Sequence, residues 1–222
     1  MIDLRDSLGE VWARASAPVA PKRSILVMSA CPGEGASSVA ASLAVMAAAE
    51  ARRSAWLVNL DVCGGDPALA FELGAYGDKL RCLSRPFDAR IGGESFVATG
   101  EDTPRLIAQR VAHSRLVVTR FRRAGLEPSQ PVFIRTSPDY WAGLQAMSDW
   151  SIVDAPALSR SKAGLAVAAQ MDGVLIVVRA DDTRLADVRA LRRAIDDYGG
   201  RCLGVVMNRV GADARLISRL AA

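Results

Sequence analysis

Residues 24–50 of the chain read SILVMSACPGEGASSVAASLAVMAAAE. Residues 25–28 are a short run of apolar side chains, residues 31–35 hold two glycines and a proline, and the residues from Ser37 onward are rich in alanine. This order predicts a buried strand, a tight loop and a helix. We expect the rest of the fold to be organised around these three elements.

The predicted loop has the character of a phosphate-binding P-loop, in which glycines let backbone N–H groups surround an anion at the start of a helix. The usual P-loop pattern places a lysine directly after its second glycine, because the lysine ammonium reaches the outer phosphates. In this chain the corresponding residue is Ala36. The sequence therefore predicts the backbone of a nucleotide site without its main phosphate-binding side chain.

Composition bounds the class of protein. A chain of 222 residues, half of them hydrophobic, is long enough for one sizeable domain with a full core. The net charge of +4 is spread over scattered arginines, so we expect solvated surface charge and no nucleic-acid partner. The four cysteines form no C-x-x-C pair, which argues against zinc or a disulfide framework. The sequence has no signal peptide and no apolar run long enough to span a bilayer, which predicts a cytoplasmic protein.

The N-terminal segment has an apolar face at helical spacing, formed by Leu4, Leu8, Val11 and Trp12. We expect an amphipathic helix that packs on its own domain, although docking to another protein remains an alternative. Two prolines within residues 17–23 indicate a linker. We therefore divide the chain into an N-terminal helix and linker, residues 1–23, and a P-loop NTPase-like domain, residues 24–222.

The remaining pattern alternates between strand and helix. A strand at 55–61 follows the first helix, which implies a parallel pair of strands with a right-handed crossover. A short helix is predicted within 68–77, and residues 103–123 resemble a helix running into a strand. The elements expected after that are strand 131–137, helix 138–149, strand 150–158, helix 165–170, strand 172–180, helix 183–200 and strand 201–210. The predicted fold class is α/β, with a mostly parallel sheet flanked by helices on both faces.

Several polar residues stand where a nucleotide site would need them. Gly33, Gly35, Ser37 and Ser38 could supply backbone donors and a hydroxyl, and Asp154 follows a predicted strand as a magnesium carboxylate would. Asp61 is a second candidate carboxylate. Each residue also has a purely structural interpretation, since Ser37 could be a helix N-cap and Asp154 could cap a turn.

Five segments together resemble one family: SACPGEGASS, VNLDVC, IVDAPA, DGVLIVVRADDT and LGVVMNRV. They are similar to motifs in the cytoplasmic domain of bacterial tyrosine kinases (BY-kinases) of capsule and exopolysaccharide export, within the MinD and ParA group of P-loop ATPases. The resemblance covers residues 24–67 and 148–210. It implies that nucleotide is held by Gly33, Glu34, Gly35, Ala36, Ser37, Ser38 and Asn208, with Asn208 on the adenine base. It also implies magnesium on Ser37, Asp61 and Asp154.

The departures from the family pattern fall on its chemistry. Ala36 replaces the lysine, Asn59 replaces the first aspartate of D-x-D, Cys63 replaces an arginine, and Ala157 replaces the second proline of D-x-P-P. Losing the lysine removes a contact worth about 1.5 to 3 kcal/mol in binding. A missing cation at the transferring phosphoryl group lowers the rate on the order of a thousandfold or more. We expect weak or absent ATP hydrolysis and no autophosphorylation.

Three cations could substitute for the missing lysine: Arg160, Lys162 and Arg179. The sequence alone does not place any of them at the P-loop. The three tyrosines of the sequence are isolated, whereas the family phosphorylates a tyrosine cluster. Mg-ATP or ADP would therefore bind, if at all, with weakened affinity.

The leading hypothesis is a catalytically degenerate BY-kinase-like protein that regulates synthesis and export of an exopolysaccharide, capsule or holdfast-type polymer. By resemblance, its partner would be a membrane polysaccharide co-polymerase, which would bring it to the inner membrane as a peripheral protein, and it could form a homo-oligomer. One alternative is an active MinD/ParA-type ATPase in cell division, pilus or cellulose-synthesis positioning. A third is a dinucleotide-binding oxidoreductase, because G-E-G-A-S-S imitates part of G-x-G-x-x-G.

Overall fold

The computed structural model describes residues 1–17, 23–62, 64–99, 105–127, 130–180 and 182–209. The strands are β1 (Arg23–Ser29), β2 (Ala55–Asn59), β3 (Phe87–Asp88), β4 (Val97–Ala98), β5 (Leu106–Arg110), β6 (Leu116–Phe121), β7 (Phe133–Ile134), β8 (Trp150–Asp154), β9 (Gly173–Arg179) and β10 (Cys202–Asn208). The α-helices are α1 (Gly9–Ala15), α2 (Ala36–Glu50), α3 (Pro67–Glu72), α4 (Pro138–Met147), α5 (Ala163–Val167) and α6 (Leu185–Asp197). Short 3-10 helices are η1 (Arg5–Ser7), η2 (Asp78–Leu80) and η3 (Ala168–Gln170).

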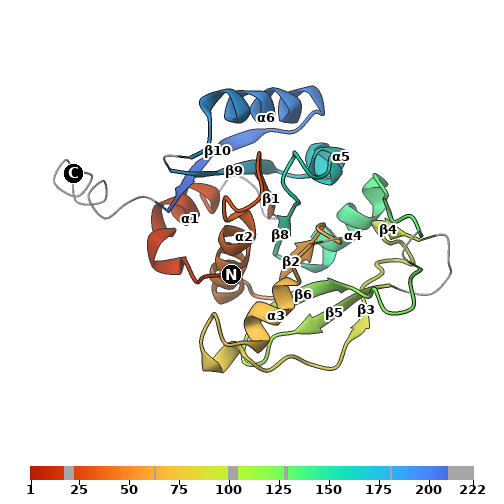
Figure 1. Ribbon diagram of the computed structural model, residues 1–222. Helices are drawn as coiled ribbons and strands as arrows, with labels where there is room; N and C mark the ends of the chain where they lie inside the picture. Colours follow the sequence, from red (N-terminus) through yellow and green to blue (C-terminus); the bar gives the residue numbers. More distant parts are fainter. Residues whose placement is uncertain (18–22, 63, 100–104, 128–129, 181, 210–222) are drawn as a thin grey trace.

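Eight of the described strands form one sheet in the order β10-β9-β1-β8-β2-β6-β5-β3. The strands from β10 to β6 are parallel, and β5 and β3 extend the sheet in antiparallel pairs. Helices α1, α2 and α3 contribute to the core on one face, and α4, α5 and α6 to the core on the other (Figure 1). The predicted α/β class, with a mostly parallel sheet covered on both faces, is confirmed.

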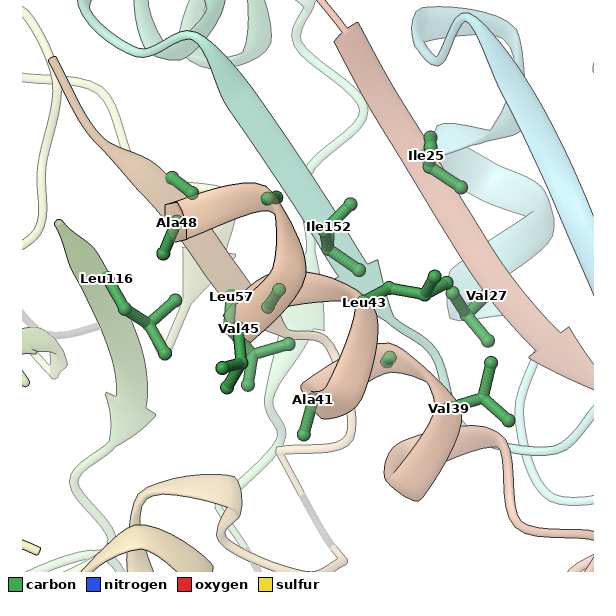
Figure 2. Close-up of a cluster of buried hydrophobic side chains, with 14 of the residues drawn as sticks. Ile25, Val27, Val39, Ala41, Leu43, Val45, Ala48, Leu57, Leu116 and Ile152 are labelled. Atoms are coloured by element: carbon green, nitrogen blue, oxygen red, sulfur yellow. The ribbon is translucent and has the colours of Figure 1, made fainter. Parts of the chain in front are cut away.

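Helix α2 lies at the centre of one face of the sheet. Its side chains point toward strands on both sides of it, and Leu43, Ile152 and Val27 gather in one apolar cluster (Figure 2). Most of the helix is buried, because the sheet covers one side and the N-terminal segment and α3 cover part of the other. Its many alanines let these neighbours approach closely. The helix start, and with it the P-loop, is therefore fixed in place.

The first two strands are parallel members of one sheet, as predicted, but they are not neighbours in it. Strands β1 and β2 are parallel, but β8 lies between them and pairs with both. The crossover through α2 leaves room for one strand between β1 and β2, and β8, which comes much later in the chain, occupies it. As a result the ends of three strands, at Ser29, Asn59 and Asp154, lie at the same edge of the sheet.

The predicted helix within residues 103–123 is wrong for its described part. Residues 105–123 contain the antiparallel pair β5 and β6. Leu106 and Ala108 are buried on alternate positions, which is the period of a strand. The turn between the strands contains His113 at φ 56°, and the Ser114 hydroxyl accepts a hydrogen bond from the N–H of Leu116. A turn without glycine or proline concealed this hairpin from the sequence pattern.

The N-terminal segment is helical but interrupted, with η1 and α1 meeting at Leu8. Leu8 and Trp12 are buried in the same core as α2. The Trp12 indole donates a hydrogen bond of 2.6 Å to Glu50, and its ring lies 4.7 Å from that of Trp150. The expectation that this segment packs on its own domain is confirmed. Residues 18–22 of the predicted linker lie outside the described residues, and the division at residue 23 stays a prediction.

The other predicted elements correspond to observed ones, with shorter bounds. The strand predicted over 55–61 ends at Asn59, and the strand predicted over 131–137 is reduced to Phe133–Ile134 in a separate two-stranded sheet with β4. The helix predicted over 165–170 is divided between α5 and η3. None of the helices in the described part of the chain is both long enough and apolar enough to cross a bilayer.

Candidate functional site

The P-loop backbone has the predicted strand, loop and helix. Gly33 and Gly35 adopt positive φ angles of 85° and 95°, a conformation that favours glycine. Gly35 is the N-cap of α2 and accepts hydrogen bonds from the N–H groups of Ser38 and Val39. A Cβ atom on Gly35 would lie 2.0 Å from Nδ2 of Asn208, so a side chain is excluded on this ground as well. The alternative role of Ser37 as N-cap is therefore wrong.

Glu34 and Asn208 hold the loop in shape. The Glu34 carboxylate accepts hydrogen bonds from the Cys31 N–H at 2.9 Å and from the Thr183 hydroxyl. The Asn208 amide donates to the backbone oxygen of Glu34 at 2.9 Å. Glu34 is only 3% exposed, so its side chain stabilises the loop through these buried hydrogen bonds. Thr183 was not predicted from the sequence, and it connects the P-loop to the segment between β9 and α6.

A cavity of about 330 Å³ lies over the P-loop. Loop and helix residues line one side of it, and the turn after β2 and the segment after β8 line another. Its lining includes five of the predicted cofactor-binding residues, Gly33, Gly35, Ala36, Ser37 and Ser38. The volume lies at the lower end of the range usual for small-ligand sites.

The side chain at the lysine position contributes no charge, since Ala36 is 6% exposed and ends in a methyl group. A different cation lines the cavity. The Arg160 guanidinium, from the segment after β8, donates to both carboxylate oxygens of Asp61 at 2.9 and 3.2 Å. Of the three candidate substitutes, Lys162 and Arg179 are not among the residues that line this cavity.

Asp154 lies at the end of β8 and is 2% exposed. Burial raises the pKa of its carboxyl to about 7, a hydrogen bond with Ser37 lowers the pKa, and the charge of Asp61 raises it. One carboxyl oxygen, Oδ1, has no hydrogen-bond partner among the described residues. Asp154, Ser37 and Asp61 are thus brought together, as the sequence predicted.

The arrangement does not fit a resident magnesium ion. Magnesium takes charged oxygen ligands, but the Arg160 guanidinium is hydrogen-bonded to both carboxylate oxygens of Asp61. Within the described ranges, no cluster of three or more His, Cys, Asp or Glu side chains could hold a metal. The assignment of Ser37, Asp61 and Asp154 as magnesium ligands stays a prediction.

Asn59, at the position of the first aspartate of D-x-D, organises a turn. Its side-chain oxygen accepts a hydrogen bond from the Asp61 N–H at 2.9 Å, and its amide donates to the Gly65 backbone oxygen at 3.1 Å. The amide is neutral and 5% exposed, so it cannot act as a base. Cys63, at the position of the family's arginine, lies outside the described residues.

The N-terminal segment reaches the site, which the sequence did not indicate. The Ile2 N–H donates to the Ser38 hydroxyl at 3.1 Å, and the Leu4 N–H donates to that of Ser42 at 2.9 Å. A second cavity, of about 360 Å³, is lined by this segment together with Gly35, Ser38, Asn208 and Arg209. Asn208 therefore borders an open space beside the P-loop, where the resemblance puts the adenine base.

No protein-family profile matches the sequence, and no curated protein does. Solved structures do match. The VpsO kinase domain is 19% identical with a TM-score of 0.64, over 93% of this chain and 94% of that one. The kinase domain of the Escherichia coli tyrosine kinase ETK is 15% identical with a TM-score of 0.61, over 94% and 76%.

A ParA-family ATPase from Chlorobium tepidum TLS is 18% identical with a TM-score of 0.54, over 89% of this chain and 78% of that one. Identities this low show the fold and leave the activity open. They agree with the resemblance drawn from the five sequence segments. The chain therefore has the P-loop α/β fold shared by bacterial tyrosine kinase domains and ParA-family ATPases.

Proposed function

We propose that this chain is a catalytically degenerate BY-kinase-like protein that regulates the synthesis and export of an exopolysaccharide, capsule or holdfast-type polymer by binding a membrane co-polymerase. The observation that carries the proposal is a P-loop backbone whose cavity is lined by Ala36 and by the Arg160–Asp61 ion pair. The phosphate cradle has been kept, and the groups that make it reactive are absent or engaged.

Phosphotransfer requires a cation at the transferring group, a metal on carboxylates and a base or acceptor for the nucleophile. The methyl group of Ala36 supplies no cation, and Asn59 supplies no base. Asp61 carries a guanidinium in place of a metal. These losses act on one step, so we expect no measurable transfer.

The tyrosines of the chain are poor acceptors for the same reaction. Tyr140 and Tyr76 are 0% and 2% exposed, and the pKa of Tyr140 is raised well above its ordinary value by burial. Tyr198 is 47% exposed but stands alone at the end of α6. The buried hydroxyls of Tyr76 and Tyr140 cannot enter the active site of a neighbouring copy without local unfolding.

The co-polymerase partner is proposed by analogy with the kinase domains that share the fold, and it would hold this protein at the inner membrane. An active MinD/ParA-type ATPase is the second candidate, favoured by one observation: Arg160 places a cation at the cavity where Ala36 provides none. ATP-dependent dimerisation with hydrolysis would support that candidate.

The proposal is tested in cells that lack the gene and are complemented with the wild-type chain. We expect deletion to reduce exported polymer and the wild type to restore it. The restored protein should crosslink to a membrane co-polymerase while carrying no phosphotyrosine by immunoblot. Unchanged polymer after deletion, or phosphotyrosine on the wild-type chain, would contradict the proposed function.

A further inference from the structure

The cavity of about 330 Å³ over the P-loop, called the phosphate cavity below, is lined by an arginine that does not belong to the P-loop. Arg160 lines the cavity opposite the start of α2, and its guanidinium is bound to Asp61 through two hydrogen bonds. We propose that this cavity binds the diphosphate group of a nucleotide without magnesium, with Arg160 in the place that the metal takes in a working P-loop enzyme. This inference rests on the proposed function, because it assumes a site that no longer performs phosphotransfer.

The position of Arg160 is set by the sheet. The N–H groups of Leu158 and Ser159 donate to the backbone oxygens of Ser29 and Ala30 at 2.9 and 3.1 Å, which ties the segment after β8 to the end of β1. Arg160 follows directly, with its N–H bonded to the Ala157 oxygen at 2.9 Å. The guanidinium is therefore presented at the cavity by backbone contacts.

Asp61 is equally well placed, by the turn that follows β2. Its N–H is bonded to the Asn59 side chain, and its backbone oxygen accepts the Gly64 N–H at 3.0 Å. A Cβ atom on Gly64 would lie 1.9 Å from the Asp61 carboxylate, so the turn closes tightly against this side chain. The Asp61 side chain is 14% exposed, compared with 42% for Arg160. The more exposed guanidinium is the partner that can change its acceptor.

A phosphate group offers Arg160 what the carboxylate offers now. Both anions present two oxygens to the fork of the guanidinium, and a phosphate oxygen can also accept the N–H groups at the start of α2. A divalent cation would bind poorly at this site. It would compete with Arg160 for the Asp61 oxygens, and the positive guanidinium would repel it. The structure thus favours an anion and disfavours a metal at the same place.

The surroundings extend the site beyond a single phosphate. Arg209 lines both the phosphate cavity and the adjacent cavity of about 360 Å³, which share Gly35 and Ser38 as well. The two cavities are therefore neighbours, and Arg209 is a second basic residue beside the phosphate cavity. The remaining carboxyl at the site, that of Asp154, is 2% exposed at the end of β8 and does not line either cavity. A diphosphate with an attached nucleoside fits this pair of spaces.

The test is calorimetry of the full chain with inorganic pyrophosphate, ADP and ATP, each in EDTA and in excess magnesium. We expect pyrophosphate and ADP to bind in EDTA, and excess magnesium to weaken their binding, because it converts the free anions to magnesium complexes that the site disfavours. Arg160→Ala should weaken binding in EDTA by about tenfold or more, because a charge-assisted contact is lost. Arg179→Ala is the matched control. Its side chain is 43% exposed and also pairs with an aspartate, but it does not line the cavity.

Asp61→Asn supplies an independent test that does not depend on Arg160→Ala folding. It keeps the shape of the side chain, frees the guanidinium and removes a negative charge, so binding in EDTA should tighten about fivefold. Binding that appears only with magnesium, or no binding of any of the three anions, would overturn the inference and leave the proposed function intact. ATP turnover in the same samples would instead overturn the proposed function.

Discussion

The substitution Asp154→Asn tests the electrostatics of the site through stability. Asp154 is 2% exposed beside the P-loop, and burial raises the pKa of its carboxyl from 3.8 to about 7. A difference of about 3 pKa units corresponds to about 4 kcal/mol between the folded and unfolded states. Because Asn is neutral at every pH, it removes this dependence while keeping nearly the same shape.

The sign follows from which state holds the proton. Below pH 4 the Asp154 carboxyl is protonated in both states, and its contribution is fully present. Between pH 4 and 7 the unfolded chain releases the proton and the folded chain keeps it, so stability of the wild type is lost as pH rises. Above pH 7 the loss is complete. The free energy of unfolding of Asp154→Asn, relative to wild type, should therefore rise by about 3 kcal/mol between pH 5 and 8.

Urea denaturation followed by tryptophan fluorescence at pH 5, 6, 7 and 8 measures this difference. Comparing two variants at each pH cancels the titration of all other groups that the substitution leaves unchanged. A difference in unfolding free energy that is the same at pH 5 and pH 8 would refute the assignment of a raised pKa to Asp154.

Three further substitutions test a surface ion pair, the packing of α2 and the P-loop backbone. Asp149→Asn should show the opposite trend: the hydrogen bonds of Arg53 lower the pKa of Asp149, so in the same urea assay the variant should lose more stability relative to wild type at pH 7 than at pH 3. Leu43→Ala should cost about 2 to 5 kcal/mol, because Leu43 is fully buried between α2 and the sheet; thermal unfolding that is unchanged would contradict this packing. Gly35→Ala should lower Tm and weaken pyrophosphate binding, because Gly35 has a φ of 95° and an added Cβ atom would lie 2.0 Å from Asn208 Nδ2. Wild-type values of both quantities would contradict the described loop.

The elements with strong local signals were predictable from sequence. The apolar run of β1, the glycines at 33 and 35 and the alanine-rich α2 specify strand, loop and helix by short-range physics, and the structure has them in place. The same holds for the alternation of β8, β9, α6 and β10. By contrast, the hairpin of β5 and β6 has a turn without glycine or proline, and only pairing across the sheet distinguishes it from a helix.

The site was predictable in residue type but not in pairing. Asp61 and Asp154 follow separate strands, and the rule that parallel strands end at one edge brings them together. Whether Arg160 or Lys162 lies at the P-loop depends on the hydrogen bond between the Leu158 N–H and the Ser29 oxygen. This contact joins residues that are far apart in the sequence, so no local pattern predicts it. The contact of Ile2 with Ser38 is of the same kind and has no local signal.

The central claim is that the nucleotide cradle is retained and its chemistry is not. The most direct measurement is transfer from radiolabelled Mg-ATP by the purified chain, following both released phosphate and label on the protein. We expect phosphate release no faster than in buffer and no labelled tyrosine, at any protein concentration. Sustained release, or label on a tyrosine that disappears in Asp154→Asn, would contradict it.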